Sequence, residues 1–212
     1  MSAPCDLDLL QRWLTGWSRS RGLPLPRHEG GGQRVDVDWP DQQRRHVFAD
    51  AGAALRACAD AIHDPFIYVK AAVDCATLRA ALPERWSIEE QRYLMTHSGP
   101  MQSAAALPAD YTTLLTVEHA AYVIDVIDGA GAVAASGRVT LNAGTAVFDR
   151  ISTDAAHRRL GLATAVMLSL DRLATQAAST ERLLVATEMG AALYTHLGWR
   201  ILAPFATAFL PQ

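Results

Sequence analysis

The stretch from Thr112 to Ala178 constrains the fold of this chain more than any other part of it. Four strand-like runs follow one another there, separated by turn-forming segments rich in glycine, asparagine and aspartate: residues 112–117, 121–127, 132–141 and 145–152. After them the apolar spacing changes, and residues 162–178 have the period of a helix with one buried stripe. The pattern predicts an antiparallel meander that leads into a packed helix, which is a mixed α/β (α+β) architecture.

The segments on either side continue this order of elements. After the helix we expect a short buried strand, a helix and a last strand, at residues 183–186, 191–197 and 201–210. Before the meander, the spacing predicts a helix, a hairpin, a second helix, a strand and two short helices: residues 7–21, 34–48, 51–62, 66–69, 74–82 and 88–95. Ser87 begins an S-x-x-E capping box, which favours the last of these helices.

A linker is expected between the two halves of the chain. Gly99-Pro100 and Leu107-Pro108 bracket the small residues 103–106, and such punctuation is typical of a segment between lobes. We therefore divide the chain into an N-terminal α/β region, residues 1–108, and a core, residues 109–212. No internal repeat is obvious in the sequence, although the expected order of elements in the first region is one that a diverged copy of the second would have.

Composition excludes several classes of protein. The net charge of −3 and the pI near 6.1 argue against a nucleic-acid-binding protein. The three cysteines form no C-x-x-C pair, so neither a metal site nor a disulfide framework is predicted. No apolar run reaches the ~20 residues that a membrane helix needs, and the N-terminus lacks the features of a signal peptide. A cytoplasmic protein without a membrane or nucleic-acid partner is expected.

The loop between the last meander strand and the helix carries the chemistry. The first turn of a helix has four backbone N–H groups without helical partners, and the helix dipole adds positive partial charge there. A diphosphate can accept these hydrogen bonds if no bulky side chain blocks its approach. Gly161 and Ala163 leave that space, and Arg158 can add a charged contact.

Two motifs give this region a family resemblance. Arg158-x-x-Gly161-x-Ala163 resembles the R/Q-x-x-G-x-G/A signature of the GNAT superfamily (GCN5-related N-acetyltransferases), and it follows a strand as in that family. Leu193-Tyr194-x-x-x-Gly198-Trp199 resembles the family's second motif, one helix and one strand further on. The resemblance covers residues 111–212 and implies a mostly antiparallel sheet that opens beside the signature strand.

The resemblance implies acetyl-coenzyme A as co-substrate, with no metal. Backbone groups of the signature strand would hold the pantetheine arm: Ile151, Ser152 and Thr153. The pyrophosphate would be held by the loop and the helix start: Arg158, Arg159, Leu160, Gly161, Leu162, Ala163 and Thr164. Thr187 occupies a position where many relatives have asparagine, and its hydroxyl would cap the next helix or contact the pantetheine.

The resemblance also suggests catalytic residues. Tyr194 would be the general acid toward the leaving thiolate, or else a core tyrosine. Asp149, spaced to share a strand face with Ile151 and Thr153, would be the general base or attract a cationic substrate. An ion pair with Arg150 or Arg138 is its structural alternative. Glu188 is a second candidate base, or a helix N-terminal charge. His157 is expected to pack in the loop.

These inferences support more than one function. The first is an acyltransferase enzyme that moves an acetyl group directly to a primary amine of a small molecule or peptide; a homodimer is the one assembly considered, and the sequence leaves the oligomeric state open. The second is a catalytically silent domain that senses acyl-coenzyme A. A nucleotide-binding domain is disfavoured because no Walker or Rossmann glycine pattern is present. Residues 66–95, with their expected order of strand, helix and helix, either complete the core or belong to a diverged GNAT-like half.

Overall fold

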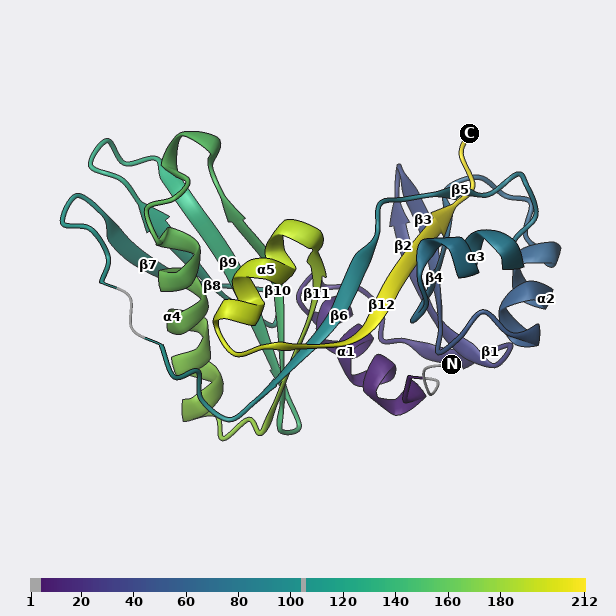
Figure 1. The fold of residues 1–212 in the computed structure, drawn as a ribbon, viewed down its shortest axis with the longest axis horizontal. Helices are drawn as coiled ribbons and strands as arrows, with labels where there is room; N and C mark the ends of the chain where they lie inside the picture. The colour runs from purple at the N-terminus through teal and green to yellow at the C-terminus, as the bar shows by residue number, and fades with distance from the viewer. Residues whose placement is uncertain (1–4, 104–105) are drawn as a thin grey trace.

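The computed structural model describes residues 5–103 and 106–212 and contains two lobes joined through one continuous sheet (Figure 1). The strands follow the order β1-β2-β3-β4-β12-β6-β11-β10-β9-β8-β7, and β5 pairs with β12. The elements in chain order are α1 (Leu7–Arg19), β1 (Arg27–Glu29), β2 (Gly32–Trp39), β3 (Gln42–Phe48), α2 (Ala53–Ala61), β4 (Ile67–Ala71), α3 (Cys75–Ala81), β5 (Ser87–Ile88), β6 (Arg92–Ser98), β7 (Thr112–Glu118), β8 (Ala121–Ile127), β9 (Val133–Asn142), β10 (Thr145–Thr153), the 3₁₀ turn η1 (Ala155–His157), α4 (Leu162–Gln176), β11 (Glu181–Thr187), α5 (Glu188–His196) and β12 (Arg200–Phe209).

The second lobe is built on the predicted meander. Strands β7 to β10 are antiparallel neighbours, and β11 returns parallel to β10 after α4. Helix α4 lies against this sheet and buries Leu162, Val166 and Leu170, the stripe that its apolar spacing predicts. The mixed, mostly antiparallel sheet flanked by helices is confirmed.

The first lobe repeats the same order of elements on a smaller scale. Strand β3 pairs antiparallel with β2 and parallel with β4, and helix α2 makes the parallel crossover. In the second lobe β10 has the same relation to β9, to β11 and to α4. A shorter helix follows each parallel strand, α3 in the first lobe and α5 in the second.

The predicted helix over residues 88–95 is wrong. This segment forms the end of β5 and the start of β6. Leu94 and Met95 are both fully buried but on opposite faces, Leu94 in the core on the α1 side and Met95 in the core beneath α4. A strand covered on both faces reads as a short apolar run, which periodicity alone does not separate from a helix. Residues 66–95 therefore do not have the order strand, helix, helix.

The lobes exchange their last strands. Strand β6, which precedes residue 108 in the chain, pairs with β11 of the second lobe, and the end of β12 pairs with β4 of the first lobe. β6 and β12 also pair with each other, so they form the centre of the sheet (Figure 1). Helix α1 packs beneath this junction, where Trp13 contacts Phe205 of β12 with ring centroids 5.2 Å apart.

Two earlier expectations fall partly on residues that are not described. The predicted linker at 103–106 includes residues 104 and 105, and the N-terminal segment expected to lack signal-peptide features includes residues 1–4. Within the described ranges, no helix is both long and apolar enough to cross a lipid bilayer.

Candidate active site

An opening in the sheet lies at the end of β10. Strands β10 and β11 are paired only from Thr145 to Val147 and from Glu181 to Leu183, and they separate beyond these residues. The rest of β10 pairs with β9 on its other side, with a bulge between Asp149 and Ser152. Backbone groups of β10 and β11 that face this opening are therefore not used by a ladder between the two strands.

The bulge decides which way the side chains of β10 point. Arg150 adopts a left-handed conformation with φ of 53°, and the register shifts by one residue there. Asp149 consequently lies on the α1 face, where it meets Arg21, whereas Ile151 lies on the α4 face and packs over Gly137. The prediction that Asp149 shares a face with Ile151 and Thr153 is wrong, because it assumed regular alternation.

The start of α4 lies directly after this opening. The cap residue Gly161 has φ of 77°, a conformation that favours glycine, and a Cβ built there would meet no atom within 4 Å. Among the described residues, no hydrogen bond is donated by the amides of Gly161, Leu162, Ala163 and Thr164. Four amides without a protein hydrogen-bond partner in the described part of the chain thus lie at the positive end of a 15-residue helix.

The loop before α4 is held by its own contacts. The Asp154 carboxylate accepts a hydrogen bond from the Ala156 amide at 2.9 Å and caps the turn η1. His157 contacts the hydroxyl of Tyr111 at 2.8 Å and lies 3.5 Å from the Asp128 carboxylate. These contacts tie the loop to β7 and β8, in agreement with a packing role for His157.

Three exposed side chains of the same loop remain available to a ligand. Arg158, Arg159 and Leu160 are solvent-exposed. Among the described residues, neither arginine has a carboxylate partner within ion-pair distance. Two positive charges therefore flank the four unpartnered amides.

Helix α5 brings Tyr194 and Thr187 to the far side of the opening. The Thr187 hydroxyl accepts a hydrogen bond from the Gly190 amide at 3.1 Å, so it caps α5 as one of its two predicted roles requires. The ring of Tyr194 lies over Gly190, where an added Cβ would be 3.2 Å from Tyr194 Cε2. Burial, reinforced by the charge of Asp149, raises the pKa of Tyr194 to about 12. Glu188, the first residue of α5, is exposed.

Asp149 has a partner that the sequence did not indicate. Its Oδ2 lies 2.5 Å from Nη1 of Arg21, just beyond the C-terminus of α1. Arg138, one of the two partners considered, instead donates to the Ser20 carbonyl at 3.1 Å and pairs with Glu118. The side chain of Arg21 is only 9% exposed, so this ion pair is largely shielded from water. A spacing argument could not find Arg21, because 128 residues separate it from Asp149.

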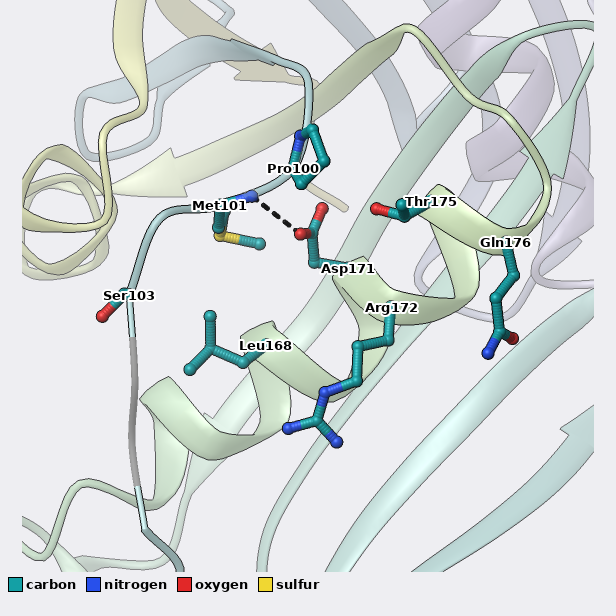
Figure 2. A pocket seen from close by; sticks show the side chains of 8 residues that line it. All are labelled: Pro100, Met101, Ser103, Leu168, Asp171, Arg172, Thr175 and Gln176. Atoms are coloured by element: carbon teal, nitrogen blue, oxygen red, sulfur yellow. Dashed lines mark hydrogen bonds between the residues drawn. The ribbon is translucent and has the colours of Figure 1, made fainter.

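A cavity of the second lobe lies away from this opening. It has a volume of about 480 Å³, lies beside the C-terminal half of α4 and is lined by Met101, Leu168, Asp171 and Thr175, among others (Figure 2). Asp171 accepts hydrogen bonds from the Met101 amide at 2.8 Å and from the buried Arg182 Nε at 2.6 Å. These contacts fasten the chain after β6 to α4. No group of three or more potential metal-ligating side chains occurs among residues 5–103 and 106–212.

The solved structures that this chain resembles share the fold of the GCN5-related N-acetyltransferases. No family model and no curated protein matches the sequence. A GCN5-related N-acetyltransferase from Kribbella flavida superposes with a TM-score of 0.68 at 14% identity, over 99% of this chain and 97% of that one. A tandem GNAT protein from the clavulanic acid biosynthesis pathway gives 0.59 at 15% identity, over 100% and 90%. A GCN5-related N-acetyltransferase-like protein from Streptococcus suis gives 0.57 at 13% identity, over 96% and 100%.

Proposed function

We propose that this chain, which has the fold of the GCN5-related N-acetyltransferases, is an acetyl-coenzyme A-dependent N-acetyltransferase. Its acceptor would be the primary amine of a small molecule or a peptide. The observation that carries the proposal is the adjacency of two features: the opening between β10 and β11, and the four unpartnered amides at the start of α4. A long thioester with a diphosphate needs both, a slot for its arm and a positive site for its phosphates.

The residues of this site fit coenzyme A in chemical terms. Amides 161–164 and the guanidinium groups of Arg158 and Arg159 would hold the diphosphate. Backbone groups of Ile151, Ser152 and Thr153 border the opening and would hydrogen-bond the pantetheine arm. Acetyl-coenzyme A would supply an acyl group activated as a thioester.

Tyr194 would act as the general acid. A tyrosine phenol is protonated at neutral pH and can therefore supply the proton that a leaving thiolate needs; the rise of the Tyr194 pKa to about 12 keeps the phenol protonated but makes it a weaker acid. Asp149 is a poorer candidate for the general base, because its carboxylate already has an ion-pair partner in Arg21. Asp149 would then orient or attract the ammonium form of the acceptor, and the exposed Glu188 would be left as the candidate base.

The same ion pair supports a second candidate function, a catalytically silent sensor of acyl-coenzyme A. Such a protein needs the cofactor site but no base. Coenzyme A release from acetyl-coenzyme A, measured with pools of primary amines, separates the two functions. An enzyme releases thiol in proportion to acceptor, whereas a sensor binds acetyl-coenzyme A without turnover.

The cofactor site itself is tested by calorimetry with acetyl-coenzyme A, ATP and NAD. We expect binding of acetyl-coenzyme A alone, weakened about tenfold in Arg158→Glu because a repulsive charge replaces a charged hydrogen-bond donor. Arg172→Glu, an exposed position on the same helix beyond its N-terminal half, is the matched control and should bind like the wild type. Equal affinity of Arg158→Glu and wild type would contradict the proposed site.

The first lobe is proposed to be a diverged GNAT-like unit without a cofactor site, with the division near residue 108. Its support is the repeated order of strands and helices about a parallel pair, β3–β4 in one lobe and β10–β11 in the other. A cytoplasmic location remains our expectation for such an enzyme, since acetyl-coenzyme A would have to be supplied there.

A further inference from the structure

A second cavity lies between the lobes, on the face of the sheet that α1 covers. It encloses about 280 Å³ and receives side chains from both lobes and from α1. Its charged lining consists of four basic and two acidic residues, an excess of two positive charges: Arg21, Arg45, Lys70, Arg92, Glu89 and Asp149. No hydrophobic core needs such a lining, so its charges require an explanation.

Two of these cations are buried without an acidic partner. Arg45 and Lys70 are each only 8% exposed. Within the described part of the chain, neither has a carboxylate within ion-pair distance. Lys70 Nζ donates to the Thr207 hydroxyl at 2.7 Å, and Arg45 Nη2 donates to the Gln42 side-chain oxygen at 3.1 Å. Both partners are neutral, so neither balances the charge.

The surroundings of Arg45 leave part of its guanidinium unused. Its central carbon lies 3.6 Å from the ring centroid of Trp17, which supports the cation from one side. Its Nε is buried and has no hydrogen-bond partner among the described residues. Burial lowers the pKa of Arg45 to about 9 and holds that of Lys70 well below its ordinary value. Such groups are costly to keep in the absence of an anion.

The position of the cavity connects it to the proposed site. Asp149 of β10 and Val185 of β11 line it, and each lies two residues beyond the last paired residues of the two strands, Val147 and Leu183. The cavity therefore meets the opening in the sheet from the face opposite α4. The Asp149 carboxylate, which is paired with Arg21, borders the opening, while Arg45 and Lys70 come from the neighbouring strands β3 and β4.

We propose that this cavity binds the acceptor and that Arg45 and Lys70 recognise an anionic group on it, a carboxylate or a phosphate. The acceptor amine would then lie toward Asp149 and the opening. This inference rests on the proposed transferase function and narrows its substrate to amines that carry a negative group, of which amino acids are the simplest. The two separated charges of such a molecule match the separated charges of the cavity.

The turnover test uses sets of amines that differ only in the anionic group. Each set contains an amino acid, its amide and the corresponding decarboxylated amine, and aminoalkyl phosphates form a separate arm that distinguishes phosphate from carboxylate. We expect kcat/KM for the anionic members to exceed that for the neutral members by at least about tenfold. Equal or faster acetylation of the amides and decarboxylated amines would overturn the inference.

A binding test does not depend on turnover. Glutamate, other amino acids and inorganic phosphate are titrated into the full chain without acetyl-coenzyme A, and Kd is compared among wild type, Lys70→Met and Arg44→Gln. We expect Lys70→Met to weaken anion binding at least about tenfold. Arg44 neighbours Arg45 but does not line the cavity, so Arg44→Gln should bind like the wild type.

The outcomes separate the inference from the proposed function. Anion binding that Lys70→Met abolishes, with no turnover of any amine, supports the anion site and removes the transferase. Turnover of neutral amines, with no anion binding to the wild type, removes the anion site and keeps the transferase. If Lys70→Met does not fold, the wild-type titrations and the amine sets still decide, because neither needs a variant.

Discussion

The two lobes share one order of elements, but among the strands that the structure describes the parallel pair of the second lobe separates early and that of the first does not. Between β3 and β4 the parallel pairing runs over five residues, Arg44–Phe48 with Ile67–Ala71, without a bulge. Between β10 and β11 it ends after three. The first lobe thus uses its backbone groups to close the ladder, and the second leaves them unpaired between these two strands. The same connectivity therefore does not by itself produce the opening that the proposed cofactor site needs.

The starts of the two crossover helices differ in the same sense. Before α2, the Asp50 carboxylate accepts a hydrogen bond from the Gly52 amide at 2.7 Å, so a negative group already occupies that helix start. Before α4, two arginines adjoin four amides, and none of these groups has an ion-pair or hydrogen-bond partner among residues 5–103 and 106–212. An acid would repel a diphosphate from the first helix, and the arginines would attract it to the second.

The largest expected effect concerns an anchor that occurs in the second lobe. Asp171→Asn leaves the buried Arg182, 0% exposed, without its balancing charge, and should lower the free energy of unfolding by about 3–5 kcal/mol. Chemical denaturation measures it. Arg12→Gln breaks a partly exposed ion pair with Glu181 in the same lobe and should cost no more than about 1 kcal/mol. Similar losses in both variants would contradict the role of the buried pair.

The helix that follows the parallel strand pair differs between the lobes in one reactive side chain. In the second lobe this helix, α5, contains Tyr194, whereas in the first lobe the corresponding helix, α3, contains no tyrosine. Tyr194→Phe removes the proposed proton donor and should lower kcat about 10²-fold or more. The KM for acetyl-coenzyme A should change little, because the phenol is not expected to hold the phosphates. Steady-state kinetics measures both constants, and an unchanged kcat would assign Tyr194 to the core alone.

Paired glycine substitutions test the two helix starts. Gly161→Val places a branched side chain at φ of 77° beside the open amides, and it should weaken acetyl-coenzyme A binding about 50-fold. Gly52→Val changes the matching cap of α2, whose φ of −79° lies outside the left-handed region; its Cβ would displace the Asp50 carboxylate, whose Oδ1 would be 2.6 Å away, but it should leave that affinity unchanged. Calorimetry on both variants decides, and a loss in Gly52→Val alone would place the cofactor in the first lobe.

The smallest expected effect is on how the free energy of unfolding depends on pH. His46 of β3 is 3% exposed, and burial lowers its pKa to about 4. The unfolded chain therefore binds a proton below the ordinary pKa of about 6.5 that the folded chain does not, so stability falls as the pH drops through this window. From about pH 7 to about pH 5 this loss should be about 2 kcal/mol.

His46→Gln should remove most of that slope, and the exposed His196→Gln should keep it. Denaturation midpoints at several pH values provide the measurement. A slope that is the same in the wild type and His46→Gln would show that other groups carry the acid response.

The local parts of the site could be predicted from the sequence, because short-range chemistry determines them. The loop before α4, the glycine cap at Gly161 and the cap formed by Thr187 each depend on residues within one turn of each other. The meander was equally accessible, since its alternation and turns are local signals.

The long-range parts could not be predicted in the same way. Arg21 reaches Asp149 through the packing of α1, and one left-handed residue, Arg150, reverses the face that simple alternation gives to Asp149. Lys70 and Arg45 read as ordinary surface cations in a sequence, and only the assembled sheet shows that they are buried. The sequence pattern does not identify strand β6, because its partners in β11 and β12 lie 83 or more residues away along the chain.

The exchange of β6 and β12 between the lobes has a consequence for the evolution of the chain as well as for its folding. A gene fragment encoding either half alone would yield a sheet with one of its central strands missing, exposing an apolar edge that invites aggregation. The first half is therefore needed for the fold whether or not it binds a ligand. Its other segments can change in sequence, while the pairing of β6 with β11 and of β12 with β4 keeps the two halves dependent on each other.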